Sequence, residues 1–211
     1  MTEKMLFIGD IHGLWENYAR ILEVYRPEHS VQVGDFGIGF HREDPARLEQ
    51  VRYAMDNFGP DNRYIRGNHD NPAACRADPR CIPDATFDAE RGIFYMGGAL
   101  SIDNAFRTPG LSWWEDEELS MDELYAAMDV YEAAKPRIVV THECPESVVP
   151  YMFNWYKTEW PSRTRQALDS MLALHRPELW VFGHWHGSRD DVRDGTRFIC
   201  LNELEAVLVD I

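Results

Sequence analysis

Short apolar runs typical of β-strands alternate along this chain with stretches whose apolar residues have helical spacing. Residues 4–9 predict a strand, residues 14–25 a helix that ends before Pro27, and residues 30–34 a second strand. Residues 45–58 and 64–67 repeat the helix and the strand. Strands that alternate with helices predict an α/β architecture, with the loops that follow the strands collected at one edge.

The second half of the chain carries shorter strand signals. Residues 92–96 and 99–102 are strand-like, and Gly97-Gly98 between them predicts a hairpin. The remaining expected elements are helices at 121–134 and 164–175 and strands at 137–141, 179–183, 197–201 and 206–211. Since the sequence contains no repeat, low-complexity tract or linker, we expect residues 1–211 to form one domain.

The start of the chain and its cysteines predict a cytoplasmic protein. The sequence begins Met1-Thr2-Glu3-Lys4 without a basic and then apolar leader, and no apolar run approaches the ~20 residues that cross a bilayer. Neither secretion nor membrane insertion is expected. The four cysteines contain no C-x-x-C pair, so they predict free thiols rather than a disulfide framework; they are Cys75, Cys81, Cys144 and Cys200.

The charge balance limits the partners. The 36 acidic residues outnumber the 21 basic ones, and the net charge of −15 disfavours nonspecific binding to long duplex nucleic acid. A local cluster of metal ions would still attract a single phosphate group, because divalent ions dominate the nearby field. The net charge therefore disfavours long duplex nucleic acid as a partner, but it does not argue against a phosphate ester as a substrate.

Five segments place Asp, His or Asn beside glycine or in a turn just after a strand signal. They are Gly9-Asp10-Ile11-His12-Gly13, Gly34-Asp35-Phe36-Gly37, Gly67-Asn68-His69-Asp70, Thr141-His142-Glu143-Cys144-Pro145 and Gly183-His184-Trp185-His186-Gly187. In open α/β sheets ligands bind beyond the carboxyl ends of the strands, so these side chains are expected to converge. Taken singly, each segment could equally be an ordinary turn.

Together the seven candidate ligands favour a metal site. They are Asp10, His12, Asp35, Asn68, His142, His184 and His186. Carboxylate, amide oxygen and imidazole suit divalent manganese, iron or zinc, and the scarcity of cysteine argues against a structural zinc site. In an extended segment the two side chains of Asp10-x-His12, or of His184-x-His186, share one face and can address one cluster.

The ordered set G-D-x-H-G, G-D, G-N-H-D, H-x-x-P and G-H-x-H resembles the motifs of the calcineurin-like metallophosphoesterases, from Gly9 to Gly187. The resemblance implies an α/β fold with a two-sheet β-sandwich flanked by helices. It also implies a phosphatase or phosphodiesterase with two divalent ions, manganese first and iron, zinc, cobalt or nickel as alternatives. In that family a hydroxide bridging the two ions attacks the phosphate mono- or diester.

The resemblance implies a role for each ligand. Asp10, His12, Asp35 and His186 would hold one metal, and Asp35, Asn68, His142 and His184 the other, with Asp35 as the bridge. His69 would give a proton to the leaving oxygen, and Asp70 would either support His69 or cap a following helix. Ile38 and Gly39 stand where the serine/threonine protein phosphatases have Asp and Arg, so a dedicated protein phosphatase is not expected.

Several residues are candidates for contacting substrate besides Asn68. Arg66 could clamp phosphate or form a surface ion pair, and Arg107 lies in a loop with Trp113 and Trp114, which either wall the substrate pocket or pack on the next helix. A second aromatic cluster could be core, a lid, a dimer contact or a stacking platform; it comprises Tyr151, Phe153, Trp155, Tyr156 and Trp160.

The leading hypothesis is a hydrolase of a small phosphorylated molecule or nucleotide. One alternative is a phosphodiesterase acting on nucleic acid or cyclic nucleotides, on short single strands rather than long duplexes. Another is a non-catalytic scaffold with the same fold, whose expected mark is the loss of metal ligands or of the catalytic histidine. None of these residues is missing here, and the sequence predicts no oligomeric state.

Overall fold

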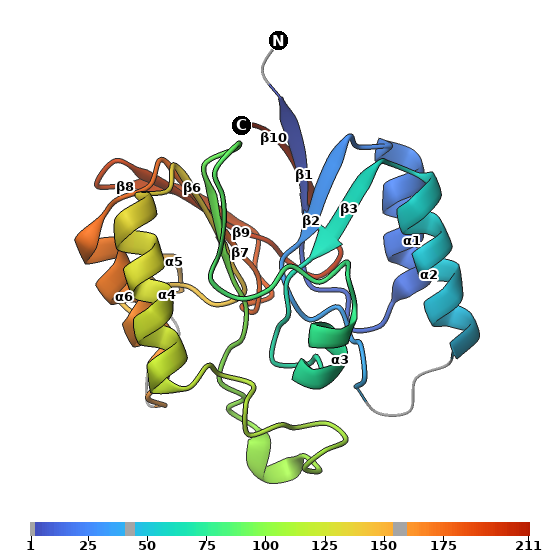
Figure 1. The fold of residues 1–211 in the computed structure, drawn as a ribbon, viewed down its shortest axis with the longest axis horizontal. Helices are drawn as coiled ribbons and strands as arrows, with labels where there is room; N and C mark the ends of the chain where they lie inside the picture. Colours follow the sequence, from blue (N-terminus) through green and yellow to red (C-terminus); the bar gives the residue numbers. More distant parts are fainter. Residues whose placement is uncertain (1–2, 41–44, 154–159) are drawn as a thin grey trace.

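The computed structural model describes residues 3–40, 45–153 and 160–211. Two β-sheets face each other, and helices cover their outer faces (Figure 1). The first sheet has the order β10-β1-β2-β3, with β1 to β3 parallel and β10 antiparallel to β1. Its strands are β1 Lys4–Ile8, β2 His29–Gln32, β3 Asp61–Tyr64 and β10 Ala206–Asp210, and its helices are α1 Trp15–Tyr25 and α2 Pro45–Asn57.

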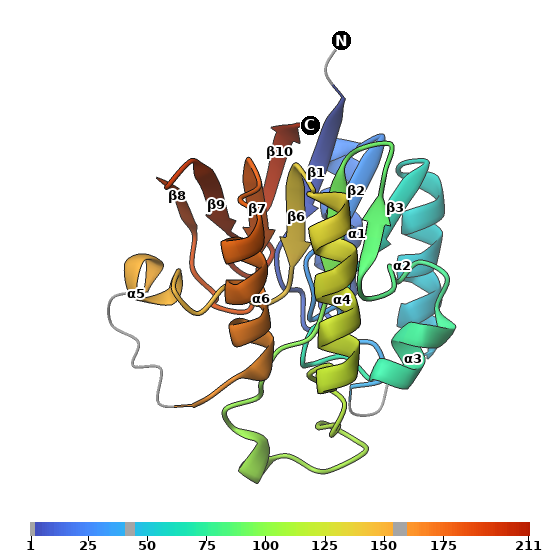
Figure 2. The same ribbon diagram turned by 60° about the vertical axis from the view of Figure 1, so that its left-hand side comes forward.

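The second sheet has the order β4-β5-β6-β7-β9-β8, with β5, β6, β7 and β9 parallel and both edge strands antiparallel. Its strands are β4 Thr86–Asp88, β5 Ile93–Met96, β6 Ile138–Thr141, β7 Leu179–Phe182, β8 Arg189–Arg193 and β9 Thr196–Cys200. Its outer helices are α4 Met121–Ala134, α5 Val149–Met152 and α6 Arg163–Leu174. The short helix α3 is Pro72–Ala77, and the 3₁₀ helix η1, Asn104–Phe106, lies in a projecting loop (Figure 2).

The layers follow from the period of two along each strand. In β1, Met5 and Phe7 join the core between the sheets, whereas Leu6 and Ile8 join the core beneath α1 and α2. The same alternation appears in β7, where Val181 packs between the sheets and Trp180 packs under the helices of the second sheet. Because successive side chains point to opposite faces, strands that are apolar at every position are covered on both sides.

The predicted α/β fold with two sheets flanked by helices is confirmed. Helix α4 has the predicted bounds, and it begins with a capping box in which the side chains of Ser120 and Glu123 bond each other's backbone N–H groups. The third strand begins three residues earlier than predicted, at Asp61, where the polar segment offers no apolar signal.

The predicted hairpin over residues 92–102 is wrong. The antiparallel partner of β5 is the preceding strand β4, and residues 99–102 form no strand. Gly97 and Gly98 do not turn the chain back. They let it pass close to Arg66: the Gly98 N–H donates to the Arg66 carbonyl at 3.0 Å, and a Cβ at Gly97 would lie 2.3 Å from that oxygen.

The carboxyl ends of the parallel strands of both sheets meet at one edge, which is the lower side of Figure 1. The loops that carry the five motifs all leave the strands at this edge. Among the described residues, no helix combines the length and apolar character required to span a membrane.

Candidate metal centre

The structure brings the seven predicted ligands together between the two sheets. Two groups have ligand atoms that all lie within 4.8 Å of one another: Asp10, His12, Asp35 and His186 in the first group, and Asp35, His142 and His184 in the second. Asp35 belongs to both. The Asn68 Oδ1 atom adjoins the second group, 3.1 Å from His142 Nε2. The groups have the membership that the sequence predicts for two metals sharing one carboxylate.

Four of these residues hold an unusual backbone conformation. The φ angles of His12, Asp35, His184 and His186 are 43°, 58°, 65° and 46°. A non-glycine residue rarely adopts such angles, at a cost of order 1–3 kcal/mol each, and they cluster at functional sites. Each of these residues follows the end of a strand, so the backbone turns sharply there and aims the side chain into the space between the sheets.

Glycine at position 67 makes room for the shared carboxylate. A Cβ built on Gly67 would lie 2.1 Å from Asp35 Oδ1, 2.3 Å from the Asp35 backbone nitrogen and 2.7 Å from His142 Nε2. No side-chain rotation relieves the contact with a backbone atom. The segment that carries Asn68 therefore approaches Asp35 as closely as it does only because residue 67 has no side chain.

We expect Gly67→Ala to lower the free energy of unfolding by at least about 2 kcal/mol, and the melting temperature by at least about 4 °C, because the added methyl group forces the backbone apart. Its affinity for divalent metal should fall as well. Gly187→Ala is the matched control: it is also next to a predicted ligand, but its Cβ would meet nothing closer than 3.5 Å. Thermal unfolding and metal titration of both variants check the prediction, and equal behaviour would contradict it.

The second group has the chemistry of a cation site. The Val33 carbonyl lies 2.9 Å from His142 Nδ1 and can only accept, so Nδ1 carries a proton and Nε2 points at the oxygens of Asn68 and Asp35, 3.1 and 3.3 Å away. Burial lowers the pKa of His142, but the Asp35 carboxylate outweighs it and raises the pKa to about 10. His142 Nε2 and the oxygens of Asn68 and Asp35 thus face one another closely enough to share a divalent ion.

The first group is built around the fully buried Asp10. Its Oδ2 lies 3.1 Å from His186 Nε2, which is itself 3.1 Å from His12 Nε2. The His184 backbone N–H donates to both carboxylate oxygens, at 3.2 and 3.1 Å. Two imidazoles and a buried carboxylate that share one point fit a borderline divalent ion, because they present lone pairs to a common centre.

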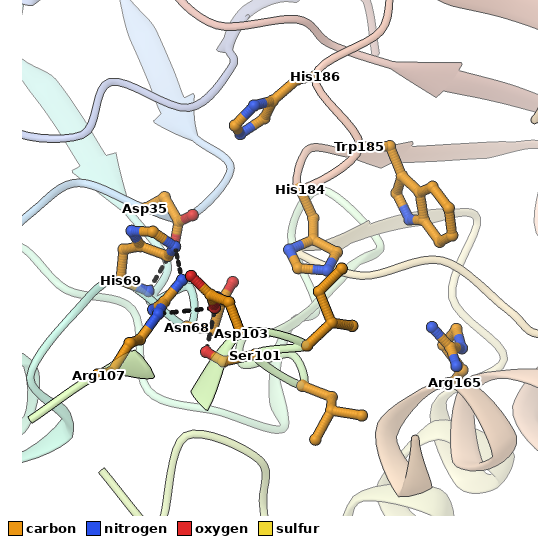
Figure 3. Close-up of a pocket in the computed structure, with 12 residues that line it drawn as sticks. Asp35, Asn68, His69, Ser101, Asp103, Arg107, Arg165, His184, Trp185 and His186 are labelled. Carbon is orange, nitrogen blue, oxygen red and sulfur yellow. Dashed lines mark hydrogen bonds and ion pairs between the residues drawn. The ribbon is translucent and has the colours of Figure 1, made fainter. Parts of the chain in front are cut away.

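A cavity of about 630 Å³ opens beside the second group (Figure 3). Asp35, Asn68, His184 and His186 form one side of it, and the rest includes His69, Ser101, Arg107, Arg165 and Trp185. A phosphate ester that entered here would meet the predicted metal ligands on one wall. The cavity also admits a group larger than phosphate alone.

His69 lies at the cavity wall and is held on several sides. Its backbone N–H donates to Asp35 Oδ1 at 2.7 Å, its ring stacks on Phe40 with centroids 4.8 Å apart, and its Nε2 lies 2.5 Å from Arg107 Nη2. Burial and the Arg107 charge outweigh Asp35 and lower the pKa of His69 to about 4. The guanidinium of Arg107 therefore faces a neutral His69 Nε2, which accepts its hydrogen bond.

Asp70 is not placed as predicted. Its carboxylate accepts from the backbone N–H groups of four residues, Phe36, Gly37, Ile38 and Gly67, at 2.6 to 3.1 Å, so it ties the Asp35 loop to the Asn68 loop. The cap of α3 is Asn71, whose side chain accepts from Ala73 and Ala74. Asp70 is neither the helix cap nor a side-chain partner of His69, because these backbone donors occupy its carboxylate.

Arg66 is not placed as a phosphate clamp. Its side chain is 7% exposed, with Nε donating to Asp84 at 2.7 Å and Nη1 to the carbonyls of Asp116 and Glu117 at 3.1 and 2.8 Å. It does not line the cavity beside the ligands. Because a carboxylate and two carbonyls already accept its hydrogen bonds, the Arg66 guanidinium connects segments of the protein and does not bind substrate.

The aromatic residues fall into different surroundings. Trp114 contacts Phe40, with centroids 6.0 Å apart, and Phe40 stacks on His69, while neither Trp113 nor Trp114 lines the cavity. Phe153 is core and stacks on the cavity residue Trp185 at 4.5 Å. Tyr151 and Trp160 are about half exposed, and Trp155 and Tyr156 lie outside the described residues.

Three buried polar residues near the ligands have no role predicted from the sequence. Ser101 and Glu117 lie outside the five motifs, and Glu143 lies inside the motif of His142. Ser101 and Glu117 are buried beside Asn68, and Glu143 is fully buried, with Oε1 accepting from Trp185 Nε1 at 2.7 Å and Oε2 3.7 Å from His184 Nε2. Polar residues scattered through loops form no pattern along the sequence. Of the three, only Glu143 could have been found from the sequence, because it lies within the motif of His142.

Comparison with known protein families gives a match over most of the chain. The family model described as calcineurin-like phosphoesterase matches residues 3–188, a span that contains all seven predicted ligands. A search of curated proteins found no match.

Solved structures share the fold at low sequence identity. The protein TT1561 of Thermus thermophilus is 13% identical, with 97% of this chain and 91% of that chain covered and a TM-score of 0.57. Phosphopantetheinyl hydrolase from Mycobacterium tuberculosis is 14% identical, with 96% and 90% covered and a TM-score of 0.58. GAP50, the anchor in the inner membrane complex of Plasmodium, is 13% identical, with 95% and 71% covered and a TM-score of 0.53.

Proposed function

Because this chain belongs to the calcineurin-like phosphoesterase family, we propose that it hydrolyses phosphate mono- or diesters at a centre of two divalent metal ions. One observation carries the proposal: two groups of candidate ligands meet and share the buried carboxylate of Asp35. Asp10, His12 and His186 complete the first site, and Asn68, His142 and His184 the second. Since ligands come from loops of both sheets, residues 1–211 are proposed to act as one domain.

When bound, two divalent ions acidify a water molecule and neutralise the charge of the phosphoryl oxygens. The chain itself holds and orients the reactants. Asp35 fixes the spacing of the two sites, Arg107 binds a phosphoryl oxygen with its planar guanidinium, and His69 gives a proton to the leaving alkoxide. In this structure the Arg107 guanidinium donates to a neutral His69 Nε2. Delivery of that proton therefore requires Arg107 to turn from His69 Nε2 to the substrate, and His69 to take up a proton from solvent at Nε2 before it gives one to the alkoxide.

Manganese is the metal we propose first, with iron, zinc, cobalt and nickel as alternatives, because carboxylate, amide and imidazole ligands suit all of them. A small phosphorylated molecule or a nucleotide is the proposed substrate, since the cavity volume suits a ligand of that size. The net charge of −15 disfavours long duplexes. We propose a cytoplasmic location because all four cysteines are free and buried.

Hydrolysis of p-nitrophenyl phosphate and bis-p-nitrophenyl phosphate, with each metal added in turn to metal-free protein, tests the proposal. Release of p-nitrophenol that depends on metal and saturates at two ions per chain is the expected result. Two bound ions without hydrolysis of either ester would instead favour a non-catalytic scaffold. Preference for the diester would favour a phosphodiesterase acting on cyclic nucleotides or short single strands.

We expect Arg107→Met to raise KM, and the inhibition constant for inorganic phosphate, by roughly 10–100-fold, with a smaller change in kcat. A charge-assisted hydrogen bond contributes about 1.5–3 kcal/mol, and methionine keeps the apolar stem but removes the donors. Steady-state kinetics with phosphate inhibition are the measurement. Arg137→Met, whose exposed guanidinium pairs with Glu178 at 3.5 Å, is the control. An unchanged inhibition constant with a reduced kcat would show that Arg107 acts on His69 rather than on substrate.

A further inference from the structure

A chain of hydrogen bonds runs from a loop of the second sheet to Asn68. The Asn68 Nδ2 group donates to Ser101 Oγ at 3.0 Å, and Ser101 Oγ donates to Glu117 Oε2 at 2.6 Å. The Ser101 backbone N–H donates to the other oxygen of the same carboxylate, Oε1, at 2.8 Å. Ser101 is 2% exposed and Glu117 3%, so water does not compete for these groups. Figure 3 shows Ser101 beside Asn68 at the cavity wall.

The direction of this chain follows from the number of protons. A serine hydroxyl has one proton to donate, and Ser101 donates it to Glu117. Towards Asn68 the hydroxyl can therefore only accept. The side of the Asn68 amide that faces Ser101 has to be the NH₂ group, and the oxygen must face the opposite way.

The opposite side of Asn68 is the second group of ligands, where Oδ1 lies 3.1 Å from His142 Nε2. A reversed amide would present NH₂ to this group, and an NH₂ group has no lone pair suited to binding a cation. The orientation of one side chain thus decides whether the second site gains or loses a ligand.

Arg66 holds the backbone of the residue whose carboxylate sets this orientation. Its Nη1 atom donates to the carbonyl of Glu117 at 2.8 Å, and Asp84 fixes the guanidinium through Nε at 2.7 Å. Arg66 lies two residues before Asn68, so the contacts form a closed ring from Arg66 through Glu117 and Ser101 to Asn68. This ring of contacts explains the burial of Arg66, which a role in phosphate binding does not explain.

We propose that Ser101 and Glu117 are positioning residues that fix the amide oxygen of Asn68 towards the metal of the second group. The inference takes Asn68 as a metal ligand, and it rests on the proposed function to that extent. Residues of this kind, which contact a ligand rather than the metal, typically change metal affinity by 10–100-fold when they are replaced.

A calorimetric titration of metal-free protein with Mn²⁺ tests the proposal without substrate. Ser101→Ala is expected to weaken the second site by about 10–100-fold and to leave the first site within about twofold. The variants His12→Ala and His142→Ala, each lacking a ligand of one group only, identify which affinity belongs to which site. Ser101→Thr keeps the hydroxyl and should recover most of the affinity.

Ser30→Ala is the matched control. Ser30 is 1% exposed and its hydroxyl donates to Asn62 Oδ1 at 2.6 Å, so it is also a buried serine bonded to an asparagine, but between β2 and β3. Its loss should leave both Mn²⁺ affinities unchanged. If Ser101→Ala does not fold, Glu117→Gln serves instead, because the glutamine amide can donate to Ser101 and thereby free the hydroxyl to donate to Asn68. Its second-site affinity should also fall.

Asn68→Asp provides the decisive background. A carboxylate presents oxygen in either orientation, so it needs no group to orient it. Ser101→Ala should therefore cause no further loss of second-site affinity in Asn68→Asp protein. An equal loss in both backgrounds, or an equal loss at both metal sites, would overturn the proposal. A protein that binds two Mn²⁺ ions but hydrolyses no ester would refute the hydrolase and leave this result standing.

Discussion

Replacement of the shared carboxylate in Asp35→Asn is expected to reduce kcat/KM by more than about 100-fold, since loss of an outer partner of a metal ligand already costs about 10–100-fold in metal affinity or activity. The two oxygens of Asp35 face different groups, Oδ1 towards His142 and Oδ2 towards His12. An amide has one neutral oxygen, so it offers oxygen to only one of the two groups. Asp35 Oδ1 accepts from the His69 backbone N–H at 2.7 Å and lies 3.3 Å from His142 Nε2. The amide oxygen should keep this position, so the NH₂ group would face the first group of ligands.

Metal titration can resolve that asymmetry. We expect the first site, with Asp10, His12 and His186, to weaken more than the second in Asp35→Asn. The control is Asp129→Asn, an exposed residue of α4 that should bind two ions with the affinities of the unaltered protein. Retention of two ions and of normal turnover in Asp35→Asn would refute a shared ligand at this position.

His69→Ala is expected to lower kcat by about 10²–10⁴-fold, which is the usual contribution of general acid catalysis, while the protein still binds two metal ions. The loss should grow as the leaving alcohol becomes less acidic, because a poor leaving group depends more on a proton from the enzyme. Turnover of aryl and alkyl phosphates, with metal content measured on the same samples, separates the two effects.

The control for that experiment is His175→Ala. This histidine lies at the end of α6 and bonds the Pro136 carbonyl at 3.0 Å, so its removal should affect stability rather than kcat. Equal turnover of several esters by His69→Ala and the unaltered protein would remove His69 from the proposed mechanism. A loss of kcat that came with a loss of metal would assign His69 to the structure of the site instead.

The fold was predictable because its local signals agree with its layers. A strand covered on both faces is apolar at every position, as in β7, and α4 carries its own capping box. The predictions of secondary structure were wrong where the local sequence pattern and the tertiary contacts conflict. Gly97-Gly98 has the composition of a turn, but it serves a close approach to Arg66, and the polar strand β3 has little apolar signal of its own.

The sequence alone determined which residues converge at the centre, because the motifs follow strands and the carboxyl ends of parallel strands meet at one edge. Only the tertiary structure decided what the neighbouring polar residues do. Asp70 bonds backbone N–H groups, Arg66 ties a loop, and Glu117 reaches Ser101 across 16 positions of sequence. Such roles depend on hydrogen-bond partners brought together by folding, and a hydrogen bond between distant residues leaves no periodic pattern in the chain.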